Sequence, residues 1–120
     1  MYSAKVLEHF KNPRNVGELA DATAVVEVSN PACGDVIVLS IKVDGQQITA
    51  ASFQARGCVA SIACGSILME MLGGKTVEQA RAIQPNTIAE ALGGLQPTSV
   101  HGSHLAHDAL EAVLAKIKQS

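Results

Sequence analysis

The sequence predicts an α+β fold in which a three-stranded antiparallel sheet carries helices packed on one face. Three observations lead to this prediction. Runs rich in β-branched residues lie between residues 24 and 55, an Asp44-Gly45 turn signal joins two of them, and helical patterns without intervening strands fill the later part of the chain. The length of 120 residues fits a single domain, residues 1–120, with one core.

The composition is that of a globular chain whose core is built from small aliphatic side chains. Hydrophobic residues make up 48% of the sequence, but aromatic residues only 2%. The formal net charge of -2 leaves no positive excess for a phosphate backbone, which argues against a nucleic-acid partner. No apolar run approaches the roughly 20 residues that span a bilayer, and the amino terminus lacks a signal-peptide pattern. We therefore expect a cytoplasmic protein without membrane contact.

The first expected element is a short amphipathic helix over residues 3–11. Its apolar side chains recur at three- and four-residue spacing, at Val6, Leu7 and Phe10. Ser3 is the expected N-cap, and Pro13 should end the helix because the residue before a proline avoids the helical conformation. We expect residues 12–23 to form a loop.

Three strands should follow, over residues 24–28, 36–43 and 47–55. Asp44-Gly45 is a strong hairpin signal because both residues tolerate a positive φ. The strands on either side of this turn should therefore pair antiparallel. The face of the sheet away from the helices can be open to solvent.

Helices should fill the remainder of the chain. A buried helix is expected to begin at Val59 and to stop at Gly73-Gly74, since its residues are small and apolar and glycine is a frequent helix stop. The capping-box patterns Thr76-x-x-Gln79 and Thr87-x-x-Glu90 predict the starts of two short helices. A last helix is indicated by an apolar stripe at Ala106, Ala109, Leu110, Val113, Leu114 and Ile117.

The three cysteines are an odd number without secretory context, which favours free thiols or a metal site over a disulfide framework. Cys33 lies in a loop between two expected strands, bracketed by Pro31 and Gly34, and Asp35 follows two residues later. A thiolate and a carboxylate at this spacing could bind one metal ion. A turn cysteine beside a solvated aspartate fits the same pattern, and both interpretations stay open.

The other two cysteines lie at and within the expected buried helix. Cys58 follows Gly57 at the helix start, where the dipole and unpaired N–H groups favour a thiolate. Cys64 comes six residues later, about 600° around an α-helix, so that it faces away from Cys58. We expect Cys64 to be a core residue, because free cysteine packs as a small hydrophobe.

Histidines on the last expected helix are further candidate ligands. His101, His104 and Asp108 fall at i, i+3 and i+7, and should share one helix face that could offer imidazole nitrogen to a metal. From these residues alone an ordinary solvated face is the preferred interpretation, because histidines on helix surfaces are common without a ligand role. His107 should point elsewhere, and His9 carries no functional expectation.

Several motifs occur together in a fixed order: Tyr2-Ser3, Asn12-Pro13-Arg14-Asn15-Val16-Gly17, Pro31-Ala32-Cys33-Gly34-Asp35, Gly57-Cys58, Gly74-Lys75, Ile88-Ala89-Glu90 and Val100-His101. In this order they resemble the iron–sulfur cluster scaffolds of the IscU/NifU N-terminal type. The resemblance runs nearly from end to end of the chain. A set of ordered motifs is far more specific than any one of them.

This resemblance implies a scaffold that is not itself an enzyme. On it a [2Fe-2S] cluster would be built from iron and from sulfur supplied by a cysteine desulfurase, and then passed to recipient iron–sulfur apoproteins. The resemblance further suggests frataxin-like or ferredoxin partners. The implied ligands of the cluster or iron are Cys33, Asp35, Cys58 and His101, with Cys64 retained as an extra candidate.

The chain departs from the family pattern in two places. Where the family has His-Cys-Ser, this sequence has His101-Gly102-Ser103, so a thiol that binds the cluster and accepts persulfide sulfur is replaced by glycine. The family's chaperone-recognition segment Leu-Pro-Pro-Val-Lys is replaced by Leu95-Gln96-Pro97-Thr98-Ser99, which predicts weak chaperone contact.

Three functions therefore remain open. The first is a variant scaffold or carrier that binds a cluster or its iron. The second is a zinc-bound sulfur-transfer partner or activator of a cysteine desulfurase, which would accept persulfide at Cys33 or Cys58. The third is a regulatory paralogue that binds no cluster. Two thiolates, a carboxylate and an imidazole suit tetrahedral zinc and also a mixed-ligand two-iron cluster, so metal content distinguishes the first two.

Overall fold

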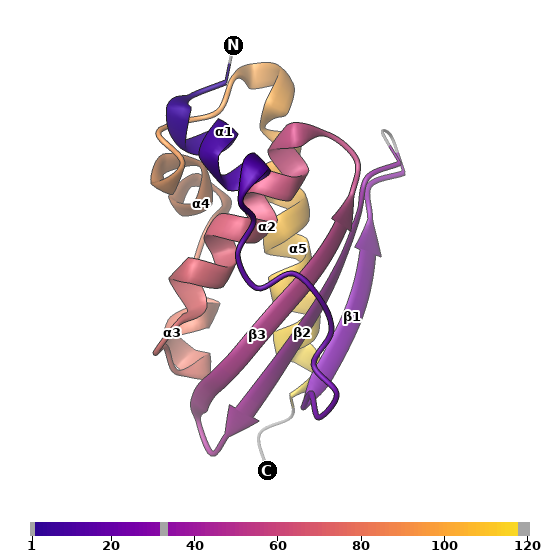
Figure 1. Ribbon diagram of the computed structural model, residues 1–120. Helices are drawn as coiled ribbons and strands as arrows, with labels where there is room; N and C mark the ends of the chain where they lie inside the picture. The colour runs from indigo at the N-terminus through magenta and orange to yellow at the C-terminus, as the bar shows by residue number, and fades with distance from the viewer. Residues whose placement is uncertain (1, 32–33, 118–120) are drawn as a thin grey trace.

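The computed structural model describes residues 2–31 and 34–117, and it confirms the predicted α+β fold. The described residues form a three-stranded sheet, and Figure 1 shows the helices lying along it. In chain order the elements are α1 (Ala4–Lys11), β1 (Ala24–Ser29), β2 (Val36–Asp44), β3 (Gln47–Arg56), α2 (Val59–Leu72), α3 (Val77–Arg81), α4 (Pro85–Ala91), the short 3-10 helix η1 (Pro97–Ser99) and α5 (His101–Lys116).

The sheet has the strand order β1-β2-β3 with both pairs antiparallel, as predicted. Gly45 takes a φ of 65° in the turn between β2 and β3, a value that favours glycine. A register shift between Lys42 and Val43 marks a bulge near this turn. Each predicted strand begins and ends within one residue of the observed one, because the runs of β-branched residues and the glycine turn mark the strand ends.

The helices pack on one face of the sheet, against alternate residues of its central strand. Ile37, Leu39 and Ile41 of β2 are at most 1% exposed. Helix α2 packs against β3, and α5 packs against β1 and β2. Phe53 lies against α2 at Gly65, where an added Cβ would come within 2.6 Å of the ring. The core is otherwise aliphatic, as the composition predicts.

The connection from α1 to β1 crosses the sheet, and this changes the prediction of a solvated outer face. Its first half pairs with the edge of β3, where Gly17 N donates to Phe53 O over 2.9 Å. Its end reaches β2, where Thr23 N donates to Ile41 O over 2.8 Å. Ser40 and Ser52, opposite each other on the outer face, are 1% and 6% exposed. The middle of that face is therefore buried.

The two capping-box predictions have different outcomes. Thr76 and Gln79 form the predicted box, with hydrogen bonds of 2.9 and 3.1 Å. The second prediction is wrong, because α4 begins at Pro85 and Thr87 lies inside the helix. Proline is well suited to the first helical position, which explains the earlier start.

No helix in residues 2–31 and 34–117 is long and apolar enough to cross a membrane.

Candidate metal centre

Three candidate ligands meet at one end of the sheet, although they come from three different elements. Asp35 immediately precedes β2, Cys58 is the N-cap of α2, and His101 is the first residue of α5. Strand pairing brings the first two together, because Val36 at the start of β2 is opposite Arg56 at the end of β3. Cys33 lies outside the described residues.

The donor atoms of these residues are close enough to share one ion. Cys58 Sγ lies 3.3 Å from His101 Nε2, and His101 Nε2 lies 3.5 Å from Asp35 Oδ2. All three donor atoms lie within 4.8 Å of one another. Sulfur, nitrogen and oxygen donors in one cluster suit zinc or iron. The arrangement is therefore a candidate metal centre.

Asp35 is buried and tightly framed. It is 5% exposed, and its Oδ2 accepts a hydrogen bond of 2.6 Å from Ser61 Oγ. Gly57 takes a φ of 137°, and a Cβ added there would overlap the Asp35 carboxylate. Glycine at position 57 is thus required both by its backbone conformation and by the space that the carboxylate occupies.

Cys58 lies at the start of α2, as the sequence predicts. It has an extended N-cap conformation with φ -79° and ψ 167°, and its side chain is half-buried. Its Sγ lies 3.5 Å from Ser61 Oγ as well as 3.3 Å from His101. The N-terminal end of a helix favours negative charge, so this position suits a thiolate ligand.

Gly102 lets the first turns of α2 and α5 approach closely. A Cβ added at Gly102 would come 3.0 Å from the backbone C and O of Ala60 and 3.1 Å from Ser61 N. Such contacts are tighter than most Cβ contacts in proteins, and they involve backbone that cannot simply rotate away. Glycine at this position therefore keeps the backbone beside His101 against the start of α2.

Cys64 is a core residue in this structure. It is 0% exposed, and burial, followed by the nearby Cys58, raises the pKa of its thiol to about 12. A thiol with this pKa stays protonated at neutral pH, whereas metal ligands are thiolates. The described geometry does not bring Cys64 into the group formed by Asp35, Cys58 and His101.

The predicted face of His101, His104 and Asp108 is not a shared binding face. His101 turns to Cys58 and Asp35, whereas His104 and Asp108 are exposed. Seven residues of α-helix span about 10 Å, which is too far for His101 and Asp108 to share one ion. His107 was expected to point elsewhere, and it lies 3.9 Å from Glu111 on the side of α5 that faces α3.

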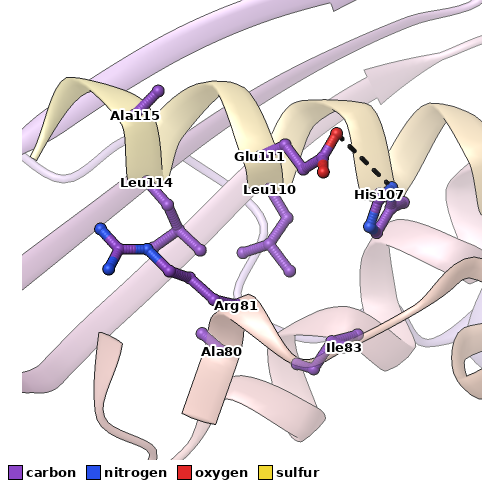
Figure 2. A pocket seen from close by; sticks show the side chains of 8 residues that line it. All are labelled: Ala80, Arg81, Ile83, His107, Leu110, Glu111, Leu114 and Ala115. Carbon is purple, nitrogen blue, oxygen red and sulfur yellow. Dashed lines mark ion pairs between the residues drawn. The ribbon is translucent and has the colours of Figure 1, made fainter. Parts of the chain in front are cut away.

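A separate hollow lies beside His107. Figure 2 shows Arg81 and Ile83 on one side of this cavity of about 310 Å³, and Leu110 and Leu114 of α5 on the other. His107, Asp108 and Glu111 form a second group of donor atoms within 4.8 Å, but Asp108 and Glu111 are exposed. This hollow is lined from the middle of α5 rather than from its first turn, so it is distinct from the candidate metal centre.

Sequence reasoning missed Ser61. It is 0% exposed, and its hydroxyl contacts both Asp35 and Cys58. The available signal was its position three residues after Cys58, since residues at i and i+3 share a helix face. Its bond to Asp35, 26 residues away in the chain, has no local signature.

Known proteins are similar to this chain in sequence and in fold. The family model of the NifU-like N-terminal domain matches residues 1–120. The iron-sulfur cluster assembly scaffold protein IscU 1 of Archaeoglobus fulgidus is 49% identical over 114 residues, which cover 95% of this chain and 74% of that protein. The scaffold protein IscU of Haemophilus influenzae is 46% identical over 121 residues, with 98% and 95% covered.

A solved structure agrees with these sequence relatives. A crystal structure from the thermophile Fervidobacterium islandicum AW-1, described as an iron–sulfur cluster assembly scaffold protein for the SUF system, superposes with a TM-score of 0.76. It is 25% identical, and the match covers 94% of this chain and 96% of that one. Sequence and fold together confirm the resemblance stated from the motifs, and the chain belongs to the NifU-like N-terminal domain family.

Proposed function

We propose that this protein is a scaffold or carrier for iron–sulfur cluster assembly, and that its cargo is a [2Fe-2S] cluster or the iron from which one is built. The proposed ligands are Cys33, Asp35, Cys58 and His101. The convergence of the last three from the starts of β2, α2 and α5, with donor atoms within 4.8 Å, is the observation that carries the proposal. The proteins to which the chain is similar are named as scaffolds of this kind.

Each ligand would have a distinct part in handling the cargo. The thiolates of Cys58 and Cys33 would hold iron firmly, whereas the Asp35 carboxylate is a harder and more exchangeable donor. An imidazole ligand carries no negative charge, so a cluster held by His101 in place of a thiolate would be less negative and would have a higher reduction potential. A mixed set of this kind suits cargo that must be released to recipient apoproteins.

The proposed partners follow from this cargo. A cysteine desulfurase would supply the sulfur, and iron–sulfur apoproteins would receive the finished cluster, with frataxin-like or ferredoxin proteins as further partners. We propose that chaperone contact is weak, because the family's recognition segment is replaced over residues 95–99. Pro97 and Thr98 are exposed in η1 and would be available to any such contact.

A second candidate function rests on the same donor set. Three protein donors of sulfur, nitrogen and oxygen type also suit zinc with one open position. Gly102 supplies no thiol beside His101, so persulfide transferred from a desulfurase would have to be accepted at Cys58 or Cys33. In this alternative the chain is a zinc-bound sulfur-transfer partner or activator. A regulatory protein without cargo is the third outcome.

The deciding experiment is anaerobic reconstitution with iron, cysteine and a cysteine desulfurase. Iron, zinc and acid-labile sulfide are measured per chain beside the visible absorption spectrum. About two iron and two sulfide per cluster support the scaffold. Zinc without sulfide supports the sulfur-transfer alternative, and neither metal with an intact desulfurase complex supports the regulatory one. The same reconstitution is made with His101→Ala, which removes a proposed ligand. His104→Ala is its matched control, because His104 lies on the exposed side of the same helix.

A further inference from the structure

We propose that Ser61 is a positioning residue of the metal centre, whose hydroxyl holds the Asp35 carboxylate in the orientation that faces Cys58 and His101. The inference deepens the proposed function, since it rests on Asp35 being a ligand. On this proposal Ser61 increases the affinity of the centre for its metal cargo by orienting Asp35, without itself contacting the metal.

The hydrogen bond between Ser61 and Asp35 is short and buried. Ser61 Oγ donates to Asp35 Oδ2 over 2.6 Å, with Ser61 0% exposed and Asp35 5% exposed. A hydrogen bond to a charged group away from water is stronger than an exposed neutral one, and a buried group that loses its partner is strongly destabilised. This bond therefore restricts the rotation of the carboxylate.

The oxygen that Ser61 holds is also the oxygen that faces His101. Asp35 Oδ2 lies 3.5 Å from His101 Nε2, and Ser61 Oγ lies 3.5 Å from Cys58 Sγ. Ser61 thus donates a hydrogen bond to one proposed ligand, Asp35, and contacts the sulfur of another, Cys58. Hydrogen bonds to the ligands of a metal fix their orientation, and loss of such a partner commonly costs about 10- to 100-fold in metal affinity.

The backbone around Ser61 keeps its hydroxyl at this place. Gly102 packs against Ser61 N, where an added Cβ would come within 3.1 Å, and Gly57 leaves the space into which the carboxylate fits. The first turn of α2 therefore packs against α5, and the Asp35 carboxylate fills the space beside Gly57. With the backbone of Ser61 packed in this way, its hydrogen bond favours one orientation of the carboxylate.

Helix α2 supplies a matched control in Ser66. It is also 0% exposed, but its Oγ bonds to His9 Nδ1 over 2.7 Å and accepts from Arg14 N over 3.0 Å. Replacement of Ser66 by alanine removes a buried hydroxyl from the same helix without touching Asp35, Cys58 or His101. An effect of Ser61→Ala that Ser66→Ala lacks is thus specific to the metal centre.

The test is anaerobic titration of the full chain with Co²⁺ and with Zn²⁺. The visible spectrum of bound Co²⁺ reports the ligand geometry, and circular dichroism checks the fold of each variant. We expect Ser61→Ala to bind about 10- to 100-fold more weakly with an altered Co²⁺ spectrum. Ser66→Ala should keep the wild-type affinity and spectrum. Ser61→Thr, which retains the hydroxyl, should restore affinity toward the wild-type value.

A double-mutant cycle with Asp35→Ala makes the test decisive. If Ser61 acts through Asp35, then Ser61→Ala has no further effect on affinity in the Asp35→Ala background. Wild-type affinity and spectrum in a folded Ser61→Ala variant would overturn the inference, as would equal losses in both backgrounds. Failure of the wild type to bind either metal, or an Asp35→Ala variant that binds as the wild type does, would instead overturn the proposed ligand role of Asp35.

Discussion

Helix α2 carries two buried serines, and their surroundings separate a candidate binding centre from a structural clip. We call the group of Glu8, His9, Arg14, Ser66 and Glu70 the clip, because it ties α1 and the loop after it to α2. In the clip, Arg14 pairs with Glu8 over 2.8 Å and with Glu70 over 2.8 Å. The guanidinium of Arg14 lowers the pKa of Glu8. Ser61 instead faces Asp35 beside Cys58 and His101.

This comparison shows how similar residue types serve different ends. Each region places a buried serine of α2 near a histidine and at least one carboxylate. In the clip the chain provides its own cation, Arg14, which ties the start of the loop after α1 to α2. At the candidate metal centre the cation would be the bound metal cargo, which is not part of the chain. The donors there include a thiol, which a clip does not need and a soft metal prefers.

The largest expected effect is on cargo loading. Cys58→Ser replaces a soft thiolate by a hydroxyl at the centre, and we expect it to lower bound iron and sulfide at least about tenfold after reconstitution. His9→Ala alters only the clip and should load at the wild-type level under conditions where it is folded. Iron and sulfide analysis of the two variants checks this contrast. Equal loading of Cys58→Ser and wild type would refute the assignment of the centre.

The reverse contrast applies to stability. His9 is 3% exposed and its Nδ1 shares a 2.7 Å hydrogen bond with Ser66, so His9→Ala removes packing and a buried polar partner together. We expect a loss of about 2 kcal/mol in the free energy of unfolding. Urea denaturation measures it, with His104→Ala as the exposed control. A change no larger than the control's would show that the clip contributes little.

Gly102 links stability with geometry. Gly102→Ala places a methyl group 3.0 Å from the backbone of Ala60, so α5 and α2 must shift apart by a few tenths of an ångström. We expect a loss of about 1 to 2 kcal/mol from overpacking, together with weaker metal binding because His101 moves from Cys58. Denaturation and Co²⁺ titration measure the two effects. A variant that is more stable and binds normally would show that the close approach is unimportant.

Cys64 should affect stability and leave loading unchanged. Cys64→Ala removes a buried sulfur from the core and leaves a small cavity, for which we expect a loss of about 1 kcal/mol. Its cluster yield should equal that of the wild type. If the yield collapses while circular dichroism shows an intact fold, then Cys64 is a ligand that compensates for the missing thiol.

The smallest expected effect is a pH dependence from the clip. Burial, followed by the positive charge of Arg14, lowers the pKa of His9 below its ordinary value of 6.5. The folded state therefore favours neutral imidazole, and the unfolded state binds the proton first as pH falls. Stability should be complete above pH 6.5 and decline below it, until the lower folded pKa is passed. Urea denaturation between pH 5 and 8 tests this, and His9→Gln should flatten the decline.

Most of the fold could be predicted because its signals are local. The strands follow from runs of β-branched residues and from the Asp44-Gly45 turn, and Ser3 and Thr76 cap their helices as predicted. The start of α4 was misplaced because Pro85 at its first position outweighs the pattern at Thr87. The burial of the middle of the outer face could not be predicted, since the loop that crosses it has no regular pattern.

The sequence alone identified the candidate ligands, because a thiol, a carboxylate and an imidazole are recognisable as metal donors before the fold is known. The meeting of these groups depended on tertiary packing. Cys58 and His101 are 43 residues apart, and Ser61 and Asp35 are 26 apart. Their contacts exist because the β2–β3 hairpin returns the chain to Asp35 and because Gly102 lets α5 lie against the start of α2. Long-range contacts of this kind leave no local pattern, which is why Ser61 appears only in the folded protein.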